Sequence, residues 1–316
     1  MRNNAVSRAA PRQLLILLCA ITGMFAVQQV FLPGSLTANQ VMLISRQASA
    51  LGIIALGQAM VILIGGIDLS VGSVVMLTNV FAIAWMRGSD SLCAQVVLLC
   101  LAMGLIVGAA NALGVLVLNI APFVMTLCSM TILQGICYVY TKGAPTGSAA
   151  PWLRSLGTGY LFGFVPYATA IWIALAALLS AALKFTSYGR KVYAVGGNLS
   201  AARLCGISTF WIRFSAYALS GVLATVAGLI LSGYINTTSL TIGGDFVMNS
   251  LAAVLIGGNA IEGGKGGVWG VVLGSFFIIA LFALLTMLSI GEVGKLIAQG
   301  LIIFGVVAVQ GVLRKA

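Results

Sequence analysis

The sequence contains no histidine and is poor in charge. Of 316 residues, five are acidic and only 7% are charged. Without histidine, Ser/His and Cys/His catalysis and most zinc sites are excluded. No two acidic residues are near neighbours in the sequence, so paired-carboxylate chemistry has little basis. A soluble domain carries about 25% charged residues, and this chain therefore cannot cover a water-facing surface.

Cysteine spacing and the distribution of basic residues exclude two further classes. The six cysteines show no C-x-x-C spacing. Most lie inside apolar runs, where cysteine behaves as a small hydrophobe, so a disulfide framework is not expected. The net charge is +11, but the basic residues fall mostly between apolar runs. Nucleic-acid binding requires a clustered basic face. We therefore expect neither a metal site nor a nucleic-acid partner.

Long apolar runs dominate what is present. Hydrophobic residues make up 61% of the chain, and several runs reach the roughly 20 residues that cross a bilayer. A membrane β-barrel would instead show alternating segments of about 10 residues. The first apolar run is too long for the core of a cleaved signal peptide and predicts a retained span. The sequence therefore predicts an all-α polytopic membrane protein.

We predict about ten transmembrane helices in a single transmembrane domain spanning residues 1–316. They are 13–32, 42–64, 70–86, 93–118, 121–140, 164–184, 210–233, 244–258, 266–290 and 293–312. The third and eighth are short, and whether the eighth crosses fully is left open. With the N-terminus in the cytoplasm, eleven basic residues lie inside and five outside. The positive-inside rule therefore predicts that both termini are cytoplasmic.

The stretch GGIDLS interrupts an apolar run that is too long for one helix. Residues 51–86 would form a helix of about 54 Å, against a hydrocarbon core of about 30 Å. Gly65 and Gly66 allow the chain to turn, and Asp68 or Ser70 can cap the following helix. A cap near the cytoplasmic interface is favoured. A substrate or proton site at the acid stays open, because intramembrane acids are commonly functional.

Residues 185–209 form the most polar internal segment and predict a cytoplasmic loop. Within it, GGNLSAARLCGIS predicts a short helix with Asn198 or Ser200 as its cap and Gly206 at its end. A helix of about two turns is not stable alone in water. It either docks into a partner groove or lies on lipid headgroups.

A glycine-rich block at residues 250–275 is the third informative stretch. Gly266, Gly270 and Gly274 recur at every fourth position. This spacing lets a neighbouring membrane helix approach closely. The polar hairpin before them lacks the glycine and Ser/Thr spacing of a Walker A loop. The chain therefore has no visible nucleotide-binding site of its own.

Polar side chains inside the predicted spans are candidates for a substrate pathway. They are Asn79, Asn111, Gln134 and Asn249, together with Gln299. Each could hydrogen-bond a passing polar solute. Each could equally join two helices, a contribution of about 0.6–2 kcal/mol, and this structural role is favoured for any single one.

Together, the three stretches resemble the membrane permease of bacterial ATP-binding-cassette (ABC) importers for monosaccharides, the ribose, xylose, arabinose, galactose and autoinducer-2 group. GGIDLSVGS resembles the signature after the second span, and GGNLSAARLCGI resembles the coupling motif. The likeness extends over about residues 40–310. Two departures are Ser200, where the broader pattern has Glu, and Lys265, where Arg is expected.

The resemblance implies the ABC importer permease fold, in the bacterial cytoplasmic (inner) membrane and in contact with lipid. It implies three partners: an ATPase that holds ATP and Mg, an extracytoplasmic sugar-binding protein, and a second permease subunit, identical or different. The chain itself then has no cofactor and is not an enzyme. The implied ATPase-coupling residues are Gly197, Asn198, Ser200, Ala201, Ala202, Arg203 and Gly206. The implied signature turn is Gly65, Gly66, Asp68 and Ser70.

Three alternatives remain at this stage. An ion-coupled secondary transporter would need a relay of buried ionisable groups, for which Asp68 is the single candidate. A membrane enzyme would place acidic or histidine clusters at the interface. A permease for another solute, such as branched-chain amino acids, would share the architecture, and the sequence does not name a sugar.

Overall fold

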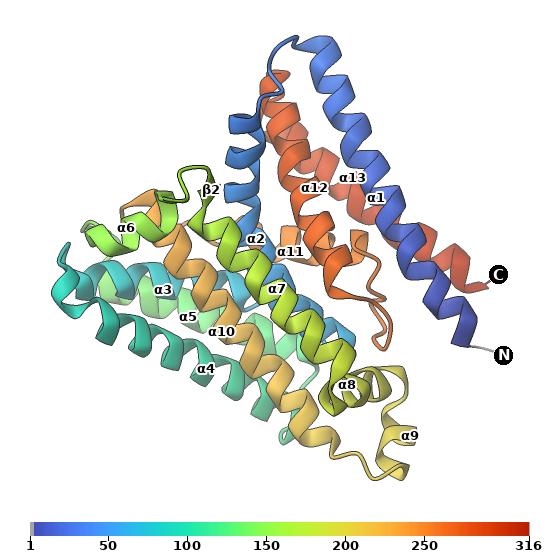
Figure 1. The fold of residues 1–316 in the computed structure, drawn as a ribbon. Helices are drawn as coiled ribbons and strands as arrows, with labels where there is room; N and C mark the ends of the chain where they lie inside the picture. The colour runs from blue at the N-terminus through green and yellow to red at the C-terminus, as the bar shows by residue number, and fades with distance from the viewer. Residues whose placement is uncertain (1–2, 316) are drawn as a thin grey trace.

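The computed structural model describes residues 3–315, which are mostly helical (Figure 1). The first half contains α1 (Asn3–Phe31), α2 (Ala38–Leu63), α3 (Val71–Met86), η1 (Asp90–Leu92), α4 (Cys93–Leu116), α5 (Pro122–Thr141) and α6 (Pro151–Thr158). A two-residue hairpin follows, β1 (Tyr160–Leu161) paired antiparallel with β2 (Val165–Pro166). The second half contains α7 (Tyr167–Phe185), α8 (Ser187–Gly197), α9 (Leu199–Leu204), α10 (Thr209–Ile235), α11 (Gly244–Ile256), α12 (Val268–Met287) and α13 (Glu292–Lys315).

Each of the ten predicted spans coincides with a helix, but the helices differ in length. Among the described residues, seven are long and apolar enough to cross a membrane: α1, α2, α4, α5, α7, α10 and α12. The short third and eighth segments are α3 and α11, with 16 and 13 residues. At 1.5 Å per residue these helices are about 24 and 20 Å long, less than a hydrocarbon core of about 30 Å.

Two helices form the centre of the molecule. The apolar windows of α2 and α10 are the most buried of the candidate spans. α10 packs against α2, α3, α4 and α6. Its contact with α4 is very close: a Cβ on Gly104 would lie 2.6 Å from the carbonyl oxygen of Gly221. Because a membrane offers little hydrophobic drive between helices, backbone approach at small residues holds such pairs together.

The glycine spacing predicted in the C-terminal block is correct for two of its three members. A Cβ on Gly270 would lie 1.9 Å from the carbonyl oxygen of Gly257, and one on Gly274 would lie 2.3 Å from that of Ala253. These glycines therefore bring α12 against α11. Gly266 precedes α12 and does not belong to this face, because its positive φ of 142° turns the chain before the helix begins.

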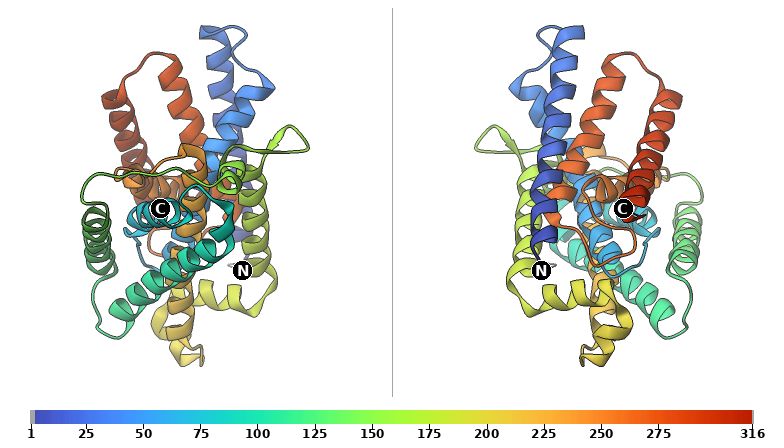
Figure 2. Two further views of the ribbon diagram at one scale, coloured as in Figure 1. Left: turned by 90° about the vertical axis from the view of Figure 1, so that its left-hand side faces the viewer. Right: turned by 90° about the vertical axis from the view of Figure 1, so that its right-hand side faces the viewer.

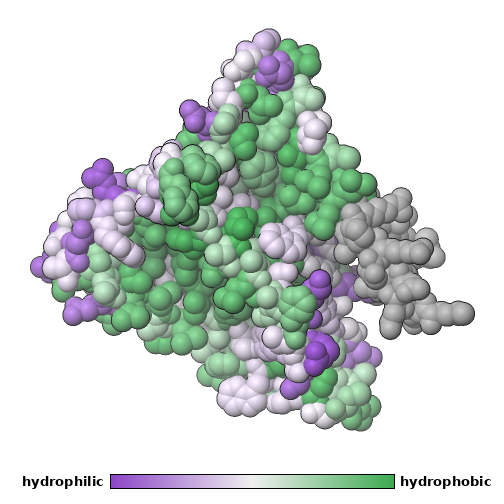
Figure 3. Space-filling view, in the orientation of Figure 1, coloured by the Kyte–Doolittle hydropathy of each residue, from purple (hydrophilic) through white to green (hydrophobic). Residues whose placement is uncertain are grey.

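The outer surface is apolar except near the ends of the helices. In Figure 3, hydrophobic residues cover the middle of the visible face, and hydrophilic residues gather around α6 and around α8–α9. Both views of Figure 2 show the α8–α9 segment projecting from one end of the molecule, away from the α1–α2 turn at the other. This distribution suits a protein whose middle lies in hydrocarbon.

Candidate functional site

The break at GGIDLS is present where the sequence predicts it. α2 ends at Leu63 and α3 begins at Val71. Gly65 has φ of +79°, a conformation that other residues rarely adopt. Its N–H donates to the carbonyl of Ile62, and the N–H of Gly66 donates to that of Val61. The two glycines therefore end α2 in a tight turn.

Asp68 lies at the centre of this break and is 1% exposed. Its Oδ1 accepts from the N–H of Ser70 at 2.9 Å and from the Ser70 hydroxyl at 2.6 Å. Its Oδ2 accepts from the hydroxyl of Ser220 on α10 at 2.8 Å. The expectation that Ser70 caps α3 is wrong for the side chain, which makes no capping hydrogen bond because it is bonded to Asp68. Asp68 instead ties the α2–α3 break to the central helix α10.

Two helices beyond α10 join the same network. Asn111 on α4 donates to the Ser70 hydroxyl at 2.8 Å and accepts from Ser129 on α5. Thr126 on α5 accepts from the N–H of Leu69 at 3.1 Å. Asn111 and Thr126 are both fully buried. The amide group of Asn111 therefore forms hydrogen bonds with protein partners, which is the structural role favoured from the sequence.

The segment predicted to couple to a partner folds as two short helices. α9 has six residues, and Asn198 caps it by accepting from the N–H of Ala201 at 2.9 Å. Ser200 lies inside α9 and is not its cap. Gly206 ends the segment with φ of +73° and turns the chain toward α10. Arg203 donates from Nε to the hydroxyl of Thr209 at 3.3 Å, which ties α9 to the first residue of α10.

The two faces of α9 differ in what they contact. Ala202 is 4% exposed and belongs to the main hydrophobic core. Ala201 and Leu204 are three positions apart, share the opposite face and are exposed. Leu204 is 90% exposed, so a large apolar side chain stands free at the end of the molecule. The Ala201–Ala202 pair therefore splits, with one alanine packed inward and one facing outward.

The three sequence stretches meet at one place, which we call the glycine junction: Leu63, Gly196, Gly197 and residues 257–267. The N–H of Gly264 donates to the carbonyl of Leu63 at 2.9 Å. Gly196, near the end of α8, packs directly against this hydrogen bond. A Cβ at Gly196 would lie 1.8 Å from the Leu63 oxygen and 2.6 Å from the Gly264 nitrogen. The end of α8 is therefore in backbone contact with the end of α2 and with the α11–α12 loop.

A tyrosine on α8 adds a side-chain link to the glycine junction. The Tyr193 hydroxyl donates to the carbonyl of Gly266 at 3.0 Å. Burial raises the pKa of the Tyr193 phenol above its ordinary value of 10.0, so the hydroxyl keeps its proton at neutral pH and remains a donor. Tyr193 and Ser220 were missed by sequence reasoning, because each acts through a partner that is remote in the chain and its sequence neighbours carry no signal. Gly196 begins the predicted GGNLSAARLCGIS stretch but was not singled out within it.

The other polar candidates have different surroundings. Asn79 is fully buried and fully engaged, donating to Ser232 and to the carbonyl of Thr237 and accepting from the N–H of Ser239. Gln134 is half-buried on α5. Asn249 on α11 is 6% exposed, and its Oδ1 has no hydrogen-bond partner among the described residues. Of these three, Asn249 has a buried polar atom without a hydrogen-bond partner among the described residues.

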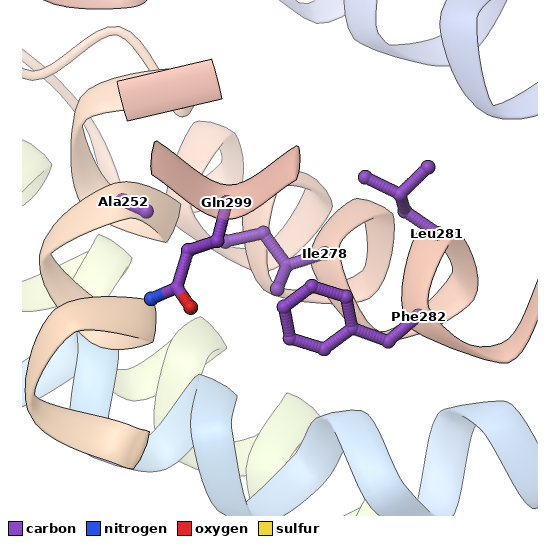
Figure 4. A pocket seen from close by; sticks show the side chains of 5 residues that line it. All are labelled: Ala252, Ile278, Leu281, Phe282 and Gln299. Atoms are coloured by element: carbon purple, nitrogen blue, oxygen red, sulfur yellow. The ribbon is translucent and has the colours of Figure 1, made fainter. Parts of the chain in front are cut away.

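Gln299 lies beside a hollow that is too small for a solute. Figure 4 shows it on α13, next to Ala252, Ile278, Leu281 and Phe282. The hollow has a volume of about 10 Å³, which is at most the space of one water molecule.

The site as a whole connects helices. Among the side chains that the structure describes, no group of three or more His, Cys, Asp or Glu could hold a metal ion. The exposed helix α9 is followed by the glycine junction at the end of α8, and the junction is followed by the buried hydrogen-bond network of Asp68, which reaches α10. Together with seven candidate spans, this arrangement is that of a multi-pass membrane protein.

Comparison with known proteins gives the family. Residues 40–307 match the family described as branched-chain amino acid transport system / permease component, and the chain belongs to it. The ribose import permease protein RbsC of Haemophilus influenzae is 37% identical over 293 residues, or 92% of this chain and 88% of that protein. RbsC of Escherichia coli K12 is 34% identical over 93% of this chain and 92% of its own length.

A third relative belongs to a different import system. The autoinducer 2 import system permease protein LsrC of Yersinia pseudotuberculosis is 31% identical over 95% of this chain and 85% of that protein. No solved structure matches the chain. These findings confirm the resemblance to ABC permeases of the monosaccharide group and the prediction of a multi-pass protein of the bacterial inner membrane.

Proposed function

We propose that the chain is the transmembrane permease subunit of an ATP-driven importer for a monosaccharide or a related small polar solute. One observation carries the proposal: the exposed helix α9 is joined through α8 to the glycine junction at the ends of α2 and α11. A six-residue helix with an exposed leucine gains stability by docking against a partner. In this class of importer, that partner is a cytoplasmic ATPase.

The proposed mechanism uses the glycine junction to transmit movement. ATP and Mg bind to the partner ATPase, whose closure displaces α8 and α9. Since Gly196 is in backbone contact with Leu63 and Gly264, α8 cannot shift without moving the end of α2 and the α11–α12 loop. Closely packed interiors transmit such shifts as movements of whole elements. The hydrogen bonds of Asp68 then carry the displacement of α2 into α3 and α10.

The proposal includes a topology of ten spans with both termini in the cytoplasm. Residues 185–209 are placed on the cytoplasmic side, in agreement with their basic residues Arg190, Lys191 and Arg203. The 142–162 loop is placed outside, where a sugar-binding protein would deliver the solute. Exposed apolar faces are covered by lipid and by a second permease subunit, identical or different.

The substrate class rests on the relatives. Two of them are named for ribose import and one for autoinducer 2 import. The family description names branched-chain amino acids, which remain the competing substrate class within the same architecture. An ion-coupled transporter has less support, because the acidic groups lie apart. Asp68 binds hydroxyls, Asp90 accepts from the N–H of Trp152, and Glu292 pairs with Lys295 at 3.2 Å.

Replacing Leu204 with serine is expected to weaken docking of the ATPase without unfolding the permease. Leu204 is 90% exposed in the isolated chain, so the change removes no internal packing. Burial of a leucine against a partner contributes about 1.5–3 kcal/mol, so the affinity for the ATPase should fall about tenfold or more. The measurement is binding of the ATPase subunit to the purified permease in lipid nanodiscs, with thermal unfolding as the check on folding.

Leu118→Ser is the matched control for this experiment. Leu118 follows α4 and is 69% exposed, but it is not part of α8 or α9. It should leave ATPase binding unchanged. Equal ATPase affinity for wild type, Leu204→Ser and Leu118→Ser would show that α9 is not the docking element. Concentration of a solute by the purified chain alone in liposomes would contradict the proposed function itself.

A further inference from the structure

A cavity lies beside the C-terminal end of α10, which is the end farther from α9. This cavity of about 140 Å³ is bounded by Val80 and Ala84 on α3, Tyr140 and Thr141 on α5, and Thr146 and Thr238 in the segments after α5 and α10. It is much larger than the hollow beside Gln299 and has room for several water molecules. α10 has 27 residues, so the cavity and α9 are separated by about 40 Å of helix.

The polar side chains lining this cavity carry hydroxyl groups, and two of these hydroxyls already donate their protons in hydrogen bonds to backbone carbonyls. The Thr141 hydroxyl donates to the carbonyl of Cys137 at 2.8 Å. The Thr238 hydroxyl donates to the carbonyl of Thr146 at 3.0 Å. Each oxygen still has a lone pair to offer, so the walls present hydrogen-bond acceptors. No charged side chain is among the described residues that line the cavity. Such a lining suits a neutral solute rich in hydroxyl donors better than an ion or a zwitterion.

Aromatic side chains form a rigid wall beside the hydroxyls. The ring of Tyr140 packs on Phe81 with centroids 4.5 Å apart, and Phe81 packs on Trp85 at 4.8 Å. Tyr140 is 45% exposed, so part of its ring is free for contact. Small-molecule sites combine apolar and aromatic walls with a few placed polar groups. The C–H face of a sugar ring and its hydroxyl edge match these two kinds of surface.

Asn79 holds the polar side of the cavity in place. It donates to the carbonyl of Thr237 at 3.2 Å and accepts from the N–H of Ser239 at 2.8 Å, so its bonds bracket Thr238 on both sides. A β-bridge between Ser148 and Thr237 joins the same segment to the loop after α5. Thr238 is consequently 6% exposed and fixed. Asn79 acts here as a positioning residue and does not line the cavity.

We propose that this cavity binds a neutral polyhydroxylated solute of monosaccharide size through Thr141, Thr238 and the Tyr140 ring. The inference rests on the proposed function and adds to it a place for the solute at the end of α10 opposite the coupling helix. It assigns the recognition of the solute within the permease to hydroxyl acceptors and an aromatic wall, without ionic contacts.

The test is saturation-transfer NMR on the full chain in lipid nanodiscs, with D-ribose as probe and L-leucine as comparison. Thr238→Val and Ala84→Phe should each lower the ribose affinity, the first by about fivefold for one lost hydrogen bond and the second by filling the cavity. The controls are Thr131→Val and Ala102→Phe. Thr131 lies on α5 and bonds the carbonyl four residues back, as Thr141 does, but its side chain is exposed. Ala102 is exposed on α4.

The outcomes separate the two proposals. Loss of ribose contact in Thr238→Val and Ala84→Phe, with both controls unchanged, supports the site. Ala84→Phe carries the test if Thr238→Val unfolds, as judged by thermal melting. Ribose contact that survives both variants overturns the site and leaves the proposed function intact. Leucine contact without ribose contact in the wild type overturns the site and the monosaccharide substrate together.

Discussion

Replacing Gly196 with alanine is expected to abolish coupled transport and to lower the thermal stability of the permease. The added Cβ would lie 1.8 Å from the carbonyl oxygen of Leu63 and 2.6 Å from the nitrogen of Gly264. It would therefore separate the two groups whose hydrogen bond joins α2 to the α11–α12 loop. Overpacking of this kind costs about 1–3 kcal/mol, and more where backbone must move. The measurements are the melting temperature in nanodiscs and ATP-driven uptake by the assembled transporter.

A glycine outside the glycine junction supplies the control. Gly135 lies within α5, and a Cβ there meets nothing within 4 Å among the described residues. Gly135→Ala should leave the melting temperature and uptake unchanged, or raise stability by about 0.4–1 kcal/mol through the unfolded chain. Equal behaviour of the two alanine variants would contradict the glycine junction as a transmission point, because the substitution is the same and only the contact differs.

Replacing Asp68 with alanine is expected to cause the largest loss of stability of any change at the α2–α3 break. The carboxyl group accepts from the N–H and the hydroxyl of Ser70 and from the hydroxyl of Ser220, and it is 1% exposed. Its removal leaves these buried donors unsatisfied at about 1–3 kcal/mol each, so a total loss of about 3 kcal/mol or more is expected. Thermal unfolding of the purified chain measures the loss.

Asp68→Asn and Ser220→Ala identify the cause of that loss. The asparagine amide oxygen can still accept from Ser70, and its NH₂ group can donate to the Ser220 oxygen, so most stability and uptake should be retained. Ser220→Ala removes one bond, worth about 1 kcal/mol. A stable Asp68→Asn variant that no longer transports would contradict the structural role and favour the reading of Asp68 as a substrate or proton site.

Much of the architecture was accessible from the sequence. The apolar runs fixed the positions of the helices, since about 20 apolar residues leave few options besides a membrane helix. The length of residues 51–86 required a break, and Gly65 and Gly66 identified its position. Asn198 was one of two recognisable candidates for a helix cap, with Ser200, because capping depends on residues three positions apart, and the structure shows that Asn198 is the cap. These inferences all depend on local geometry.

The candidate site was accessible only in part. Asp68 was identified as important, but its partner Ser220 is 152 positions away in the chain. The sequence also could not distinguish two kinds of asparagine. Asn111 and Asn79 form hydrogen bonds to protein partners, whereas the buried side-chain oxygen of Asn249 has no hydrogen-bond partner among the described residues. An amide inside an apolar run looks the same in all three cases, because the partner that decides its role lies on another helix.

The sequence by itself determined that this protein crosses the membrane and where its helices break. Each follows from composition or from spacing within a few turns. Only the tertiary structure decided that Gly196, Leu63 and Gly264 meet, that Asp68 binds α10, and that Thr141 and Thr238 share a cavity. The physical reason is that helix packing pairs surfaces across long chain separations, and hydrophobic periodicity specifies which face is buried but not against which neighbour.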